Sequence, residues 1–358
     1  MENIRVLALK PEYYVTKAAI YQGSNMLFLK SIKHSEEELK GFATIADQHA
    51  YRAEKVMQEL IAAEIRIDLI RVVIGRGGLV KPIASGVYEV NEALKRDLIQ
   101  SPLGEHSVNL GGLIADDLAQ MLPQAKAYIA DPVVVDELEP IARVTGLPGM
   151  ERRSVFHALS QKATARIYAK SVMKEYDQLN LIVANLGEGI SIGAHLKGRV
   201  VDVNQAFDGE GPFSLERSGS LPLIDLVELC FKPGSSKEQV LKLIRSEGGM
   251  MAHLGTRNLF EIEDRMDHGD EQAAFLLEAM AYQVSKYIAS LFPVFKGELD
   301  AVLLTGMLTH NRQFTDFIIE RIGKLAPVHI FPGECITDWL NMNAMMLIKG
   351  EIQPSTYS

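Results

Sequence analysis

The stretch from Asp208 to Gly219 holds the densest group of charged and small residues in the sequence. The acids Asp208, Glu210 and Glu216 and the basic Arg217 lie there among glycine, proline and serine. Such a composition predicts a loop, and loops carry a large share of binding and catalytic residues. A solvated surface loop accounts for the same charges, and from composition alone we favour it slightly.

A second candidate is the pair Gly187 and Gly189, which interrupts an apolar segment. Without Cβ atoms, two such glycines let backbone N–H groups approach a phosphate. A tight hairpin with no ligand accounts for the same residues equally well. Neither standard nucleotide motif is met: Gly193 comes one residue too late for a dinucleotide fingerprint, and residues 193–199 lack the Lys-Ser/Thr ending of a P-loop.

Arg76 and His157 are two further side chains that could take part in chemistry. Arg76 lies between glycines at the end of an apolar strand, which is an unusual place for a solvated arginine. His157 stands at the start of a predicted helix, after Arg152 and Arg153. A lone histidine in such a place is more often structural than catalytic.

These candidates must be positioned by strands and helices that the sequence pattern also predicts. Residues 4–9, 16–21 and 26–32 are apolar strands separated by turn residues, as in hairpins. Ser35 then begins a helix with a capping box, and the apolar period of that helix continues to about residue 65.

The same order returns in the second half of the chain. Residues 181–184, 190–195 and 199–203 again form three short apolar segments separated by a loop and a turn. The interrupting loops at Lys10 and Asn185 are 175 residues apart, and each begins 13 residues before the next turn glycine. The matched spacing favours a repeat over a chance likeness between two hairpins.

A second pair of segments supports the repeat, because residues 68–78 and 298–308 each run as an apolar strand into a glycine loop. Long amphipathic helices are expected between the strands, at residues 154–179, 271–291 and 311–322. The pattern predicts an internal duplication of a mixed-sheet α/β domain, residues 1–175 and 176–358, with a ligand-binding cleft between the halves.

The composition is that of a soluble globular protein. The 358 residues are 47% hydrophobic and 23% charged, which excludes a disordered chain and is typical of two domains. The net charge of −9 gives no general attraction to nucleic acid or to an anionic membrane. With only Cys230 and Cys335, a disulfide scaffold and a thiolate zinc site are excluded. Neither a signal peptide nor an apolar run of about 20 residues is present, so we expect a cytoplasmic protein.

Taken together, these residues resemble the acetate and butyrate kinase family, within the actin-like superfamily of sugar kinases and chaperone ATPases. The resemblance covers essentially the whole chain and is most specific over residues 73–82, 131–137, 154–163 and 201–219. It implies duplicated actin-like (ribonuclease H-like) domains, with the last helix able to pack back on the N-terminal one, and a homodimer. A sugar kinase or a chaperone ATPase is disfavoured by the family-specific stretch at residues 208–219.

The activity that the resemblance implies is ATP-dependent phosphorylation of a short-chain carboxylate, butyrate or a branched analogue, to an acyl phosphate. A carboxylate is already a nucleophile, so the reaction needs alignment and charge neutralisation and no general base. By resemblance, Arg76 and Arg217 flank the carboxylate and the transferring phosphoryl group. His157 donates a hydrogen bond to that phosphoryl group, and Asp131 orients these groups. Glu334 is the nearest match to a carboxylate that helps hold Mg²⁺.

The implied nucleotide contacts fall on two glycine or hydroxyl loops and one later strand. The residues are Thr16, Lys17, Asn185, Gly187, Gly189 and Gly306. Both loops depart from the family pattern. The first normally reads Asn-Pro-Gly-Ser-Thr-Ser-Thr-Lys and here contains Glu12, Tyr13 and Tyr14. The second normally reads His-Leu-Gly-Gly-Gly and here contains Glu188.

The acids in these loops matter because of their charge. A carboxylate held ~4 Å from one phosphate charge costs roughly 4 kcal/mol at an effective dielectric of about 20. Glu12 or Glu188 would therefore weaken ATP binding if it pointed inward, unless Lys10 and Lys17 offset it. Two hypotheses follow. We adopt an active carboxylate kinase with altered nucleotide loops. The alternative is a catalytically impaired relative that binds a carboxylate or acyl phosphate without turning over ATP.

Overall fold

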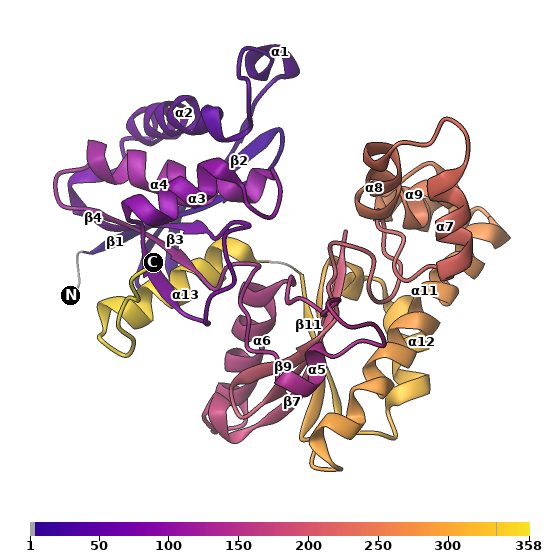
Figure 1. Cartoon of the computed structure of the whole chain (residues 1–358). Coiled ribbons are helices and arrows are strands. Elements are labelled where there is room, and N and C mark those ends of the chain that lie inside the picture. Colours follow the sequence, from indigo (N-terminus) through magenta and orange to yellow (C-terminus); the bar gives the residue numbers. More distant parts are fainter. Residues whose placement is uncertain (1–3, 334) are drawn as a thin grey trace. The chain divides into compact units, whose positions relative to one another are not determined.

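The computed structural model describes residues 4–333 and 335–358. Contacts within the chain divide it into two units, Met1–Val135 with Cys335–Ser358, and Asp136–Glu334. Each unit is built on one mixed β-sheet covered by helices (Figure 1). These two units do not coincide with the domains predicted from the sequence repeat, residues 1–175 and 176–358. The repeat-based boundaries remain a prediction.

The first unit has a six-stranded sheet in the order β3-β2-β1-β4-β6-β5. β1, β4 and β6 are parallel, whereas β2, β3 and β5 pair antiparallel with their neighbours. Helices α2, α3 and α4 lie on one side of this sheet, and α13 contacts β1 and β4 from the other (Figure 1). The bounds are β1 Arg5–Pro11, β2 Val15–Gln22, β3 Asn25–Lys33, α1 Glu36–Leu39, α2 His49–Ala62, β4 Ile70–Arg76, β5 Val87–Glu89, α3 Glu92–Gln100, α4 Leu110–Met121, β6 Lys126–Ala130 and α13 Ile336–Ile348.

The second unit has a five-stranded sheet in the order β11-β10-β7-β8-β9, in which β7, β10 and β11 are parallel. Its helices include a small group, α7 to α9, that Figure 1 shows away from the sheet. The bounds are α5 Pro140–Arg143, α6 Ala158–Ser171, β7 Asn180–Leu186, β8 Ile190–Leu196, β9 Arg199–Val203, α7 Leu223–Phe231, α8 Lys237–Arg245, α9 Gly249–Leu254, α10 Leu259–Asp267, α11 Glu271–Ser290, β10 Ala301–Gly306, α12 Arg312–Ile322 and β11 Val328–Pro332.

The two sheets share one topology, which confirms the predicted duplication. The order β3-β2-β1-β4-β6 in the first unit corresponds to β9-β8-β7-β10-β11 in the second. β1 begins at Arg5 and β7 at Asn180, which is the predicted offset of 175 residues. The turn between β8 and β9 places Lys197 at φ 49° and Gly198 at φ 83°, as a two-residue hairpin turn requires.

The core explains why the central strands are apolar throughout. Along β7, Ile182 and Leu186 face the cluster that includes Leu277 and Phe314 of α11 and α12. Leu181 and its alternate neighbours instead face α6. A strand covered on both faces has no solvent side, so alternation disappears from its sequence.

The helices follow the predictions with two differences. α11 and α12 lie where residues 271–291 and 311–322 predict them, but α6 is shorter than residues 154–179. The capping box at Ser35 is present, yet the helix that it begins ends at Leu39. Gly41 follows, and glycine is a poor helix former, so the expected continuous helix is interrupted before α2.

Candidate active site

Parallel strands bring the predicted residues of the first unit to one edge of its sheet. Arg76 is the last residue of β4 and pairs in register with Ala130, the last residue of β6. Asp131 follows β6 directly, and the loop that begins at Glu12 follows the neighbouring strand β1. Arg76, Asp131 and this loop therefore share the carboxyl edge of the sheet, where open α/β sheets bind ligands.

Asp131 is held in a strained and well-defined position. It is buried and has a φ of 36°, in the left-handed region that non-glycine residues rarely adopt. Its Oδ1 accepts hydrogen bonds from Ser85 Oγ at 2.6 Å and from the Gly86 N–H at 3.0 Å. Backbone strain of this kind is stored at functional sites more often than elsewhere.

The glycines around Arg76 serve packing. A Cβ on Gly75 would lie 2.0 Å from the carbonyl oxygen of Gly111, at the start of α4, and one on Gly77 would lie 2.5 Å from Pro132. These glycines let α4 and the loop after β6 approach the end of β4 closely. Arg76 is half-buried between them.

The loop after β1, which the sequence predicts to contact the nucleotide, is a tight turn closed by a hydrogen bond from the Glu12 N–H to the Val15 carbonyl at 2.7 Å. The Glu12 carboxylate lies 2.9 Å from Lys10 Nζ and 3.9 Å from Lys17 Nζ. Partial burial alone would raise the pKa of Glu12, but Lys10, with Lys17 and Arg76, holds that pKa below its ordinary value. The two lysines leave this trio with a net positive charge, so the expected penalty for Glu12 is largely offset.

The backbone of this loop is held by Arg52, a buried residue of α2 that the sequence did not single out. The Arg52 side chain is wholly buried, and its guanidinium donates to the carbonyls of Glu12 at 2.8 Å and Tyr13 at 2.6 Å. It also donates to Gln48 Oε1 and to Thr16 Oγ1. All these acceptors are neutral, and desolvation lowers the pKa of Arg52 to about 10. The predicted contact Thr16 is itself buried, with its hydroxyl used inside the protein.

The tyrosines of this loop do not fill the space beside the strand ends. Tyr13 and Tyr14 are 48% and 58% exposed, and the Tyr13 ring packs edge-on against His106 at 5.1 Å. Lys17, the other predicted residue on β2, is half-buried and carries the contact to Glu12 described above.

In the second unit, Asn185 and Gly306 lie at the carboxyl edge of that unit's own sheet. The two neighbours Asn185 and Thr305 pair in register near the ends of β7 and β10. Asn185 is buried and its Oδ1 has no hydrogen-bond partner in the described part of the chain. Gly306 has a φ of 98°, and a Cβ there would lie 2.3 Å from the Leu186 carbonyl. Gly306 is thus required by the fold, whereas Asn185 has a buried side-chain oxygen without a described partner.

The two glycines between β7 and β8 have different surroundings. A Cβ on Gly187 would find its first neighbour at 3.7 Å, in the flexible side chain of Met307, and the residue does not have a positive φ. A Cβ on Gly189 would lie 2.3 Å from Arg217 Nη1. Gly189 therefore makes room for Arg217, whereas no neighbour among the described residues requires glycine at 187. Glu188 between them is exposed.

Arg217 is positioned by the loop that precedes it. Its Nη1 donates to the Ala206 carbonyl at 2.8 Å, and its guanidinium lies 5.4 Å from the centre of the Phe207 ring. Ser214 Oγ accepts from the Arg217 N–H at 3.1 Å and donates to the Glu188 carbonyl. Hydrogen bonds of Ser214 thus join the loop between β7 and β8, which contains Glu188, to the loop that contains Arg217.

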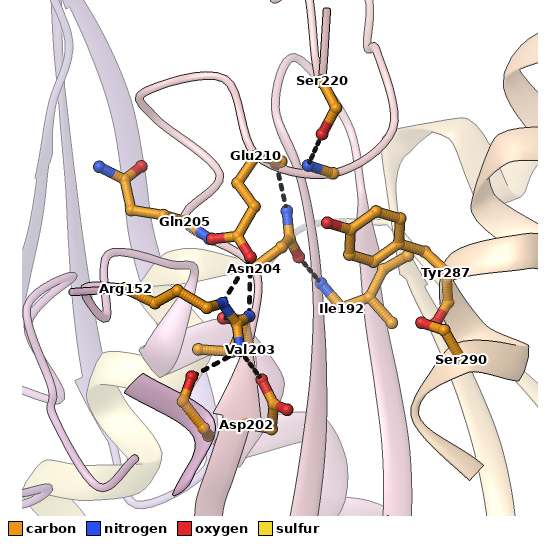
Figure 2. Close-up of polar contacts among 12 residues, drawn as sticks. Arg152, Ile192, Asp202, Val203, Asn204, Gln205, Glu210, Ser220, Tyr287 and Ser290 are labelled. Atoms are coloured by element: carbon orange, nitrogen blue, oxygen red, sulfur yellow. Dashed lines mark hydrogen bonds and ion pairs between the residues drawn. The ribbon is translucent and has the colours of Figure 1, made fainter. Parts of the chain in front are cut away.

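Figure 2 shows how the start of this loop is held. Arg152 pairs with Asp202 at 2.8 Å and with Glu210 at 2.7 Å, and also donates to the Val203 carbonyl. Asn204 bridges the sheet and the loop, because its Oδ1 accepts from Ile192 and its Nδ2 donates to the Glu210 carbonyl. The sequence singles out the charged stretch but does not reveal that Arg152 and Asn204 hold it. The one sequence feature that could have indicated this is the arginine that precedes the predicted helix.

His157 lies immediately before α6. Its Nδ1 is 2.8 Å from Ser191 Oγ on β8, and it is half-buried. Glu334, the predicted Mg²⁺ carboxylate, lies outside the described residues. Within those residues no three His, Cys, Asp or Glu side chains gather as a metal site. Mg²⁺ in kinases is held by one or two carboxylates and the substrate phosphates, so such a cage is not needed.

None of the described helices is both long and apolar enough to cross a membrane.

Comparison with known proteins identifies the family. The model of the acetokinase family matches residues 148–329. The chain is 41% identical to butyrate kinase 2 of Clostridium acetobutylicum over 355 residues, 99% of each protein. It is 43% identical to a probable butyrate kinase of Bacteroides thetaiotaomicron over 354 residues, 99% of this chain and 100% of that protein.

The fold comparison agrees. The structure of acetate kinase from Porphyromonas gingivalis superposes with a TM-score of 0.80 at 17% identity, over 96% of this chain and 100% of that one. A propionate kinase from Francisella tularensis gives 0.75 over 95% and 98%. The fold is therefore the predicted actin-like one, and the chain belongs to the acetokinase family.

Proposed function

We propose that this protein is a carboxylate kinase that transfers the terminal phosphoryl group of ATP to butyrate or a branched analogue. The observation that supports this most is the identity of 41% and 43%, along essentially the whole chain, to proteins named butyrate kinase and probable butyrate kinase. A second support is that Arg76 and Asp131 lie at the carboxyl edge of the first unit's sheet, and that His157 contacts Ser191 on β8 of the second unit.

The proposed chemistry is a direct transfer to the carboxylate oxygen. Arg76 and Arg217 neutralise the charge of the carboxylate and of the phosphoryl group in flight, which is where such catalysis gains most. His157 donates a hydrogen bond to that phosphoryl group, and Asp131 orients these groups. No proton has to be removed from the nucleophile.

The nucleotide loops divide into residues that touch ATP and residues that shape the loops. We assign direct contact to Lys17, Asn185 and Gly187, because Lys17 carries charge, Asn185 can donate its side-chain amide N–H to a phosphate oxygen, and Gly187 has no described neighbour that excludes a Cβ. Thr16, Gly189 and Gly306 shape the loops instead. When bound, Mg²⁺ would neutralise phosphate charge, and we retain Glu334 as the candidate carboxylate for it.

The test is product formation by the purified chain. Protein is incubated with Mg-ATP and acetate, propionate, butyrate or isobutyrate, and the acyl phosphate is trapped as the hydroxamate. We expect product with butyrate or isobutyrate above that with acetate. No product with any acid, together with no rise in melting temperature on adding Mg-ATP, would contradict the proposal, because a ligand that binds the native state must stabilise it.

We also propose a cytoplasmic homodimer. Helix α7 has no buried residue, and Leu223, Ile224 and Phe231 are 77%, 74% and 84% exposed. An exposed apolar helix of this kind suits a second copy of the chain. Sedimentation should give a dimer mass that Phe231→Glu lowers and that Ile141→Glu, an equally exposed apolar site, leaves unchanged. A monomer in the unmodified protein would contradict this part.

A further inference from the structure

Behind His157 runs a line of hydrogen-bonded side chains, the histidine relay. Its members, in order, are Tyr176, His195, Gln161, Ser191 and His157. The joining distances, in the same order, are 2.6, 2.9, 2.8 and 2.8 Å. His195, Gln161 and Ser191 are all wholly or almost wholly buried.

The relay is built by α6 facing β8. Gln161 lies one turn after His157 on α6, and Ser191 and His195 point to the same side of β8, four residues apart. Gly193 stands between them, and a Cβ there would lie 2.5 Å from Gln161 Oε1. This explains the glycine that fitted neither nucleotide motif: it makes room for the Gln161 amide.

The direction of the relay is fixed by one backbone carbonyl. Gln161 Nε2 lies 3.0 Å from the Ser191 carbonyl oxygen, which can only accept, so the amide nitrogen must face Ser191. Gln161 Oε1 then faces His195 and requires a proton on His195 Nε2. His195 Nδ1 is left to accept from the Tyr176 hydroxyl. Burial, with Lys162 and Arg166, lowers the pKa of His195 well below its ordinary value, so this ring stays neutral.

The other end of the relay is fixed in the same way. Ser191 Oγ is buried and receives a hydrogen bond from Gln161 Nε2, and a longer one of 3.3 Å from the His157 N–H. Among the described residues, His157 Nδ1 is the one acceptor within reach of the Ser191 hydroxyl proton. The proton of a neutral His157 ring must then lie on Nε2.

We propose that Ser191 and Gln161 are positioning residues, which hold His157 in the Nε2–H tautomer and fix its ring so that Nε2 donates to the transferring phosphoryl group. The part about the phosphoryl group rests on the proposed function. The part about the tautomer rests on the geometry of the relay alone. A ring with the proton on Nδ1 would present a lone pair to an anionic group and repel it.

The first test measures the tautomer without any turnover. The full chain is labelled with ¹⁵N-histidine, and long-range ¹H–¹⁵N correlations are recorded at pH 8, with His157 identified by its loss in His157→Gln. We expect an unprotonated Nδ1 and a protonated Nε2 for His157, and a mixture of tautomers in Ser191→Ala. A protonated Nδ1 in the unmodified protein, or an unchanged tautomer in Ser191→Ala, would overturn the proposal.

The second test measures catalysis. Ser191→Ala and Gln161→Met should lower kcat about 10- to 100-fold, the same range as the loss on removing a hydrogen-bond partner that orients a metal-bound histidine. KM for butyrate and ATP should stay within about twofold. Ser191→Thr keeps the hydroxyl and should recover most of kcat. Ser285→Ala removes another buried serine hydroxyl, on α11, and should change neither value.

The two tests separate the possible failures. A chain that shows the expected tautomer but makes no acyl phosphate refutes the proposed function and leaves the relay intact. A chain that is an active kinase in which Ser191→Ala and Gln161→Met both keep full kcat refutes the positioning role. If Ser191→Ala does not fold, the tautomer and kcat of Gln161→Met decide.

Discussion

The turns after β1 and β7 occupy corresponding places in two sheets of the same topology, yet they are built in opposite ways. The first carries Glu12 and two tyrosines, and its backbone is held from below by the buried Arg52. The second carries two glycines, and its shape depends on Ser214 and Arg217 from a different loop. Duplication thus preserved the position of each turn while the means of holding it diverged.

The largest effect should come from removing the support of the first turn. Arg52→Met leaves two backbone carbonyls, Gln48 and the Thr16 hydroxyl without their buried donor. We expect a loss of about 3–5 kcal/mol in unfolding free energy, because unsatisfied buried acceptors are costly. Urea denaturation of the full chain measures it.

The matched control for that experiment is Arg66→Met, which removes an exposed arginine paired with Asp68 on the surface. Its effect should stay within about 1 kcal/mol. Equal effects of the two substitutions would show that Arg52 does not support the first turn. The proposed difference between the two turns would then be wrong for the first of them.

The next effect sharpens the comparison within the second turn. Gly189→Ala should lower kcat about 100-fold or more, because its methyl group would occupy the place of Arg217 Nη1. Gly187→Ala should leave the melting temperature and kcat nearly unchanged and raise KM for ATP about tenfold. Steady-state kinetics distinguishes the two, and equally mild outcomes would remove the distinction between the glycines.

A pH effect of intermediate size belongs to the first turn alone. His34 is buried with Nε2 2.9 Å from Thr16 Oγ1, and desolvation, with the charge of Arg52, lowers its pKa to about 4 from 6.5. The native state therefore binds the proton less readily than the unfolded chain, so stability is lost as the pH falls from about 6.5 towards 4. The loss attributable to His34 should reach about 2–3 kcal/mol.

The variant His34→Gln isolates this contribution, since it keeps a side chain that can bond to Thr16 but cannot titrate. Urea denaturation at several pH values should show a shallower loss in the variant than in the unmodified protein. Parallel curves would mean that His34 has an ordinary pKa and that the positive charge of Arg52 is not felt there.

The smallest effect concerns Glu12 itself. Because its carboxylate already pairs with Lys10 and lies near Lys17, Glu12→Gln should change KM for ATP by no more than about threefold, or roughly 0.6 kcal/mol. A carboxylate facing the phosphates would instead give a gain of tenfold or more on removal. Titration with ATP at low and moderate salt distinguishes the two.

The duplicated topology could be predicted because equal spacing of turns is written directly in the sequence. The choice of Arg76 and His157 could also be made, since a charged side chain at the end of an apolar strand or at the start of a helix is visible. Their partners were not visible. Arg52 shares a helix face with Val56 and Leu60, but the helical period cannot say that this face covers a loop 40 residues away.

The glycines show the same limit from another side. Gly187, Gly189 and Gly193 form one pattern in the sequence, yet a Cβ at the first would make only ordinary contacts, the second accommodates Arg217 and the third accommodates Gln161. Only the three-dimensional neighbours decide which reason applies. The same residue type therefore meets a different structural requirement at each of the three positions.

The hydrogen bonds from Arg52 to the first turn end on backbone carbonyls, which every amino acid possesses. The course of this turn is therefore specified by a residue of α2 and is largely independent of the side chains within the turn. Selection can replace those side chains freely while the backbone keeps its path, so a segment can lose its family signature without losing its shape. A search that relied on the side-chain signature of this loop alone would overlook a chain such as this one, in which Arg52 of α2 holds the backbone of the turn.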